Sequence, residues 1–67
     1  MTVEIAQIES LIGELASRDG TVRQRARAEL VQIGVPAIGA LNEAAVSRDS
    51  QLRWEAVKAL AQIADSG

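Results

Sequence analysis

The chain has 67 residues, of which 48% are hydrophobic and 24% are charged, and its net charge at pH 7 is −2. A chain this short forms one domain at most, and its apolar content is typical of a folded domain rather than of a disordered segment. It contains no histidine and no cysteine, which excludes disulfides, thiolate nucleophiles, Ser-His triads and metal sites that use imidazole or thiolate ligands.

Apolar residues at helical spacing predict four helices, near residues 3–16, 20–33, 36–46 and 50–64. In chain order the apolar stripes are Ile5, Ile8, Ile12 and Leu15; Val22, Ala26, Leu30 and Ile33; Ile38, Leu41 and Ala45; and Leu52, Ala56, Leu60 and Ile63. The alternation of polar and apolar residues that marks strands is absent, and the abundant Ala, Glu, Gln and Arg favour helix. The sequence therefore predicts an all-α protein.

Residues between the stripes predict where the helices begin and end. Asp19 and Asp49 suit the N-cap position, although a capping box that begins at Thr21 would start the second helix two residues later. Gly34 suits a left-handed residue after the second helix, and Pro36 suits the first turn of the third. The connections are short, so we expect antiparallel neighbours stacked as two helical hairpins.

The chain also resembles itself with a period of 30 residues. Between residues 17–34 and 47–64, eight of eighteen aligned positions are identical. The identical pairs are Ser17/Ser47, Arg18/Arg48, Asp19/Asp49, Arg23/Arg53, Ala26/Ala56, Leu30/Leu60, Gln32/Gln62 and Ile33/Ile63. A fixed period of this length is typical of solenoids, in which each unit buries its apolar face against the next.

The pattern D-x-x-V-R-x-x-A-x-x-x-L-x-x-I-G at 19–34, followed by Pro36 and Ala37, resembles the short HEAT-like repeats of the phycobilisome-lyase type. Residues 49–63 resemble the same half-motif again, so the resemblance covers nearly the whole chain. It implies a single HEAT-like repeat domain over residues 1–67, a two-unit alpha-alpha superhelix. Such repeats mostly serve as protein-binding scaffolds, and some belong to chromophore lyases or their chaperones.

Two arginines occupy the same position of the repeat. Arg23 and Arg53 each follow an aspartate, Asp19 or Asp49, by four residues. They could form a cationic ladder for a carboxylate or phosphate. The favoured interpretation is structural: each guanidinium reaches a cap or a carbonyl in the adjacent turn, with its stem packed on the core.

A second apolar stripe on the fourth helix is the strongest candidate for an interface. It consists of Trp54, Val57, Ala61 and Ala64 and lies roughly opposite the first stripe. The aligned residues of the second helix are Gln24, Arg27, Val31 and Gly34, which are more polar. The face is expected to be covered by another protein surface, or else Trp54 folds back within a compact monomer.

Small size favours covering by a second copy. Chains below about 70 to 80 residues seldom gain more than about 3 to 5 kcal/mol from one core, and repeat stacks usually need three or more units. With no disulfide and two units only, we expect a homodimer with Trp54 at or near the seam.

The leading functional hypothesis is a non-enzymatic protein-interaction module without cofactor or metal. No histidine activates the serines, no glycine-rich phosphate loop occurs, and the carboxylates form no obvious catalytic pair. The first and third helices are expected to line a small concave surface for an unidentified protein partner. Its residues are Glu9, Ser10, Gly13, Gly39, Asn42 and Glu43.

Two alternatives belong to other classes. The chain could be an accessory subunit of a larger enzyme, such as a chromophore lyase. Nucleic-acid binding through Arg18, Arg23, Arg27, Arg48 and Arg53 is disfavoured, because the chain is net negative and its only aromatic residue is Trp54.

The sequence also favours a soluble, cytoplasmic and bacterial protein. Residues 1–5 lack the basic start of a secretory signal, and no apolar run approaches the roughly 18 residues that span a bilayer. Six of the seven cationic residues are arginine, which is typical of a GC-rich genome.

Overall fold

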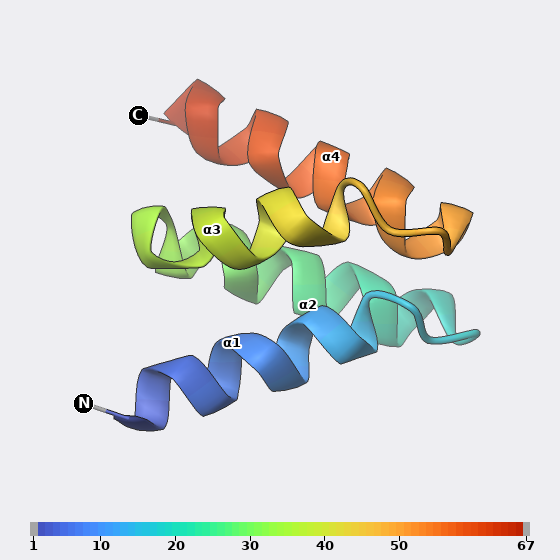
Figure 1. Cartoon of the computed structure of the whole chain (residues 1–67), viewed down its shortest axis with the longest axis horizontal. Helices are drawn as coiled ribbons and strands as arrows, with labels where there is room; N and C mark the ends of the chain where they lie inside the picture. The colour runs from blue at the N-terminus through green and yellow to red at the C-terminus, as the bar shows by residue number, and fades with distance from the viewer. Residues whose placement is uncertain (1, 67) are drawn as a thin grey trace.

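The computed structural model describes residues 2–66, with side chains described for residues 5–65, and within that range the chain forms four α-helices and no strand. The helices are α1 (Thr2–Glu14), α2 (Gly20–Ile33), α3 (Val35–Ala44) and α4 (Ser50–Ser66). The all-helical prediction is therefore confirmed. Consecutive helices run in opposite directions (Figure 1).

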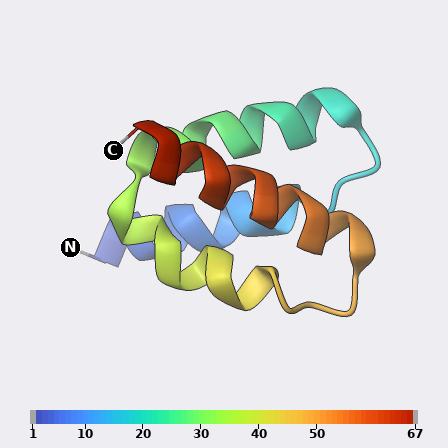
Figure 2. The same ribbon diagram turned by 90° about the horizontal axis from the view of Figure 1, so that it is seen from above.

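The two central helices, α2 and α3, lie between α1 and α4. Each of the outer helices packs against both α2 and α3, while α1 and α4 have little contact with each other. Figure 2 shows α2 and α3 on opposite sides when the molecule is seen from above. Two helical pairs, α1 with α2 and α3 with α4, are thus stacked on one another.

The core is built from leucine, isoleucine and alanine side chains of all the described helices. Its buried members are Ile8, Leu11, Leu15, Ala26, Leu30, Ala37, Leu41, Ala44, Ala56, Ala59 and Ile63. Small alanines on α2 and α4 let the helices approach closely, because an alanine occupies little space between two helix axes. One predicted member of the stripes was wrong: Ile5 is 61% exposed.

The first and third helices end earlier than the apolar pattern predicts. The expected ends were residues 16 and 46, whereas α1 ends at Glu14 and α3 at Ala44. The backbone N–H groups that follow bond three residues back instead of four, as in Ser17 to Glu14 at 3.0 Å and Ser47 to Ala44 at 3.1 Å. The last turns therefore tighten toward 3₁₀ geometry, which is common at helix ends.

The two turns that lead into α2 and α4 use the same hydrogen bonds. Ser17 Oγ accepts from the N–H of Asp19, and Ser47 Oγ accepts from the N–H of Asp49, both at 3.1 Å. Each aspartate Oδ1 then accepts from the N–H two residues further on, at 2.9 Å in both turns. Asp19 is the N-cap of α2, with extended φ and ψ of −84° and 114°. These bonds satisfy donors that a helix start leaves free.

The paired arginines close the same turns. Arg23 Nη1 donates to the Ser17 carbonyl oxygen at 2.7 Å, and Arg53 Nη1 donates to the Ser47 carbonyl oxygen at 3.0 Å. Each guanidinium thus ties the first turn of a helix to the loop before it, which is the structural role that the sequence favoured.

The α2–α3 connection is a single residue. Gly34 has a φ of +77° and a ψ of −131°, a conformation open to glycine and rarely to other residues, and its N–H donates to the Leu30 carbonyl at 3.0 Å. Pro36 lies in the first turn of α3, where no helical hydrogen bond needs its nitrogen. Among the described residues, no helix has the length and apolar character needed to cross a membrane.

Candidate functional site

The predicted interface stripe on α4 lies on the surface. Trp54 is 59% exposed and Val57 is 44% exposed, and Ala61 and Ala64 are exposed on the same side of the helix. Trp54 therefore does not fold back into the core of the subunit. An exposed tryptophan next to three aliphatic residues is an apolar patch of the kind that marks interaction surfaces.

A lysine holds the tryptophan ring in place at the edge of this patch. The Lys58 ammonium lies 5.5 Å from the centre of the Trp54 ring, within the range of a cation–π contact. The same ammonium is 3.3 Å from Glu55 Oε2. Lys58 thus connects the exposed ring to a charged cluster beneath it.

The cluster surrounds Glu55, which is the only buried charged residue among the described side chains. Its Oε1 accepts from Arg27 Nη1 at 2.6 Å, and its Oε2 accepts from Gln51 Nε2 at 3.2 Å. Arg23 Nε lies 3.7 Å from Oε2, too far for a hydrogen bond but within the range of an ion pair. A carboxylate of α4 is therefore held between two arginines of α2, and it fixes how the two helices sit against each other.

The pKa of Glu55 reflects this environment. Burial raises it, but the hydrogen bonds and positive charges of Arg27 and Lys58 lower it by more, so that the pKa lies below its ordinary value of 4.5. The group is consequently ionised at neutral pH. Such an internally neutralised carboxylate offers no free acid or base for catalysis.

The arginines considered for nucleic-acid binding do not form one free stripe. Arg23 and Arg27 turn toward Glu55, and Arg53 bonds the Ser47 carbonyl. Arg18 and Arg48 lie exposed in two separate turns. The structure thus gives three of the five guanidinium groups an internal partner.

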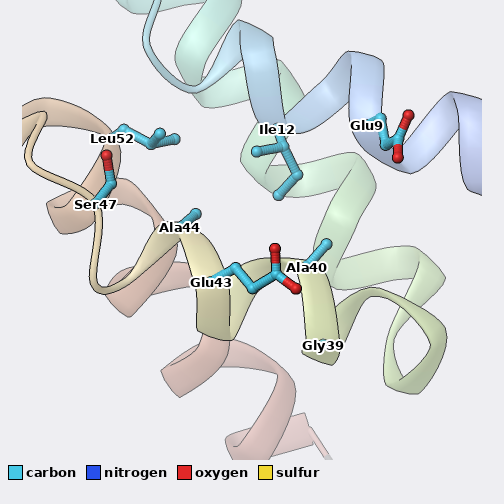
Figure 3. A pocket seen from close by; sticks show the side chains of 8 residues that line it. All are labelled: Glu9, Ile12, Gly39, Ala40, Glu43, Ala44, Ser47 and Leu52. Carbon is cyan, nitrogen blue, oxygen red and sulfur yellow. The ribbon is translucent and has the colours of Figure 1, made fainter.

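An open groove lies on the other face of the molecule, between α1 and α3. Its volume is about 720 Å³, a size that accommodates several side chains of a ligand. Figure 3 shows the lining residues, which are Glu9, Ile12, Gly39, Ala40, Glu43, Ala44, Ser47 and Leu52. The groove therefore has an aliphatic floor with a carboxylate on each of the two flanking helices.

The groove contains three of the six residues predicted for a concave surface. Glu9, Gly39 and Glu43 line it. The other three, Ser10, Gly13 and Asn42, are exposed but lie outside the lining. The helical pattern placed all six on the outward sides of two helices, but only the packing of α1 against α3 decides which of them face each other.

Charge and backbone both distinguish the groove. Helices α1 and α3 carry four carboxylates and no cationic residue, and no ion pair to Glu9 or Glu43 is formed within the described part of the chain. A Cβ added at Gly39 would meet nothing within 4 Å. The fold gives no reason for glycine in the middle of α3, where it costs helix stability relative to alanine.

Sequence reasoning missed Glu55, the most connected side chain of the molecule. A signal for it exists: Gln51, Glu55 and Lys58 are spaced four and three apart, so they share one side of α4 beside its apolar stripe. That spacing does not reveal Arg27, which is 28 residues away in the chain and comes close only when α2 packs against α4.

Comparison with known proteins gives no relative: no family model, no curated protein and no solved structure matches the chain. The HEAT-like assignment therefore stays a prediction from the sequence motif and the period of 30.

Proposed function

We propose that the chain is a non-enzymatic protein-interaction module, a HEAT-like stack of two helical pairs that self-associates as a homodimer through the exposed face of α4. The observation that carries this proposal is the exposure of Trp54 and Val57 on the same side as Ala61 and Ala64. A buried tryptophan removes some 150–250 Å² of surface from water, so that covering the ring gives a strong driving force for association.

Two features support the HEAT-like stack. The turns before α2 and α4 are built from the same serine, aspartate and arginine contacts, 30 residues apart. In addition, α4 packs on α2 and α3 packs on α1, so that one helical pair covers the other. Both features are expected of a solenoid in which each unit lies against the next.

Light scattering over a range of protein concentrations tests the self-association. We expect a mass of two chains that shifts toward one chain on dilution, and we expect Trp54→Ala to shift it at a given concentration. Val46→Ala is the matched control, since Val46 is 81% exposed but follows α3 and lies outside the patch. A single-chain mass at high micromolar concentration would refute the self-association.

The groove between α1 and α3 favours a second function, the binding of a cationic segment of a partner protein. Its two carboxylates have no partner among the described residues, and its floor is aliphatic. A side chain such as arginine, with an apolar stem and a charged end, matches both parts.

N-acetyl-leucyl-arginine amide is a suitable probe for the groove, with the corresponding leucyl-glutamine amide as the neutral control. We expect NMR shifts at Gly39, Ala40, Ser47 and Leu52, and weaker binding in Glu9→Gln/Glu43→Gln. Glu14→Gln is the matched control, because Glu14 is exposed on α1 but does not line the groove. Equal shifts with both probes, or shifts spread over unrelated carboxylates, would count against the groove as a binding site.

A further inference from the structure

The face of α4 that is exposed corresponds to the face of α2 that α4 covers. Residues 27 and 31 of α2 meet α4: Arg27 binds Glu55, and Val31 packs partly buried against the core. Thirty residues later the same positions are Val57 and Ala61, and both are exposed. α4 therefore presents outward the surface that α2 uses to receive the next helix of the stack.

One way to cover this surface is to continue the stack with a second copy. The α1–α2 pair of that copy would then lie on α3–α4 as α3–α4 lies on α1–α2. In this arrangement Arg25 of the second copy would occupy the place of Glu55, because the two positions are 30 residues apart. Arg53 would likewise occupy the place of Arg23.

Charge opposes that arrangement. Within the chain, Arg23 Nε and Glu55 Oε2 attract each other across 3.7 Å. Between copies stacked head to tail, the corresponding groups would be two guanidinium ions, which repel at such a distance. Arg25 is exposed, as the stacking surface of a further unit would be, so the repulsion would meet any copy that approaches in this way.

We infer that two copies pair through their α4 faces about a two-fold axis, so that the assembly closes at two chains. This inference rests on the self-association proposed above and names its geometry. With the two α4 helices antiparallel, the neutral residues Trp54, Val57, Ala61 and Ala64 of one copy meet those of the other. Such an isologous contact uses the same patch twice and leaves none of it free to extend the assembly.

The two-fold arrangement also keeps the arginines apart. The midpoint of the patch is at the level of residue 59, and Arg53 lies six residues before it. The two copies of Arg53 would thus be separated along the helix axes by on the order of 18 Å, at 1.5 Å per residue. This exceeds the screening length of about 8 Å at physiological ionic strength, so their repulsion is slight.

A double variant tests the inference by restoring the charges of the internal contact. Arg25→Glu with Val57→Arg supplies a carboxylate on one stacking surface and a second guanidinium next to Arg53 on the other. We expect light scattering to give a mass that rises with concentration beyond two chains, while the wild type levels off at two. Arg18→Glu with Val46→Arg makes the same charge changes outside the patch and should form no assembly larger than two chains.

Cysteine pairs give a second measurement that leaves the charges of the α4 patch unchanged, and the chain has no cysteine of its own. A mixture of Val57→Cys and Ala61→Cys chains should form an interchain disulfide readily. A mixture of Val57→Cys and Arg25→Cys chains should not, since these positions meet only in a head-to-tail stack.

The outcomes separate the geometry from the proposed function. A wild-type mass that rises without levelling off, or preferential crosslinking of position 57 to position 25, would overturn the two-fold pairing and leave self-association standing. A wild-type protein that stays a single chain at every concentration would overturn both.

Discussion

Glu55 is the residue on which the packing of α2 against α4 depends most. Its carboxylate is buried and accepts hydrogen bonds from Arg27 and Gln51, with Arg23 and Lys58 close by. We expect Glu55→Gln to lower the free energy of unfolding by about 2 kcal/mol at pH 7, because hydrogen bonds to charged groups contribute about 1.5 to 3 kcal/mol each. Urea denaturation measures this change.

Glu14→Gln is the control for that substitution, since Glu14 is an exposed residue in the last turn of α1. Its effect should stay within about 0.5 kcal/mol, as for most surface changes. If both variants lost equal stability, the ion-pair cluster would not be the cause.

Acid should remove the contribution of Glu55. Its pKa in the folded chain lies below the ordinary 4.5, so the unfolded chain takes up a proton first as the pH falls. The stabilisation is fully present above pH 4.5 and is lost as the pH falls through the lower pKa of the folded state. The difference between wild type and Glu55→Gln in urea midpoints should accordingly be constant from pH 7 to 5 and should narrow below pH 4.5.

At the scale of the helix, two glycines should respond in opposite directions to the same substitution. Gly39 lies within α3 with open space around it, so Gly39→Ala should stabilise the fold by about 0.5 to 1 kcal/mol. Gly34 has a φ of +77°, so Gly34→Ala should destabilise it by about 1 to 3 kcal/mol. Thermal unfolding of the two variants would show both signs, and a stabilising Gly34→Ala would contradict this explanation of the α2–α3 connection.

Local sequence explains most of the helix boundaries. The starts of α2 and α4 follow from Asp19 and Asp49, whose side chains bond the first free N–H groups of each helix. The ends of α1 and α3 were predicted two residues too late, because Leu15 and Ala45 continue the apolar pattern after the backbone has tightened. Apolar spacing reports which residues face inward and not which hydrogen bonds form.

The candidate site was predictable where it depends on one helix and not where it depends on two. Trp54 and Val57 could be placed on one face from the spacing within α4 alone. The contact of Glu55 with Arg27, and the division of the concave residues between groove and open surface, needed the packing of different helices. Ile5 failed for a related reason, since a helical wheel gives the side of a helix but not whether a neighbour reaches that turn.

For the whole molecule, association should raise thermal stability. A ligand that binds only the folded state stabilises it, and here the ligand is a second copy. We expect the melting temperature of the wild type to rise with protein concentration, and that of Trp54→Ala to change much less. Differential scanning calorimetry at several concentrations measures both, and a wild-type melting temperature that is independent of concentration would contradict the pairing through α4.

The uneven distribution of charge gives the molecule a dipole moment. The carboxylates of α1 and α3 have no cation on their own helices, while every lysine and arginine lies on α2, on α4 or in the turns that precede them. A charged protein that diffuses toward this chain therefore meets a field that turns the two molecules before they touch, with the acidic groove toward a basic visitor. Such pre-orientation speeds the encounter, and added salt slows it because mobile ions weaken the field.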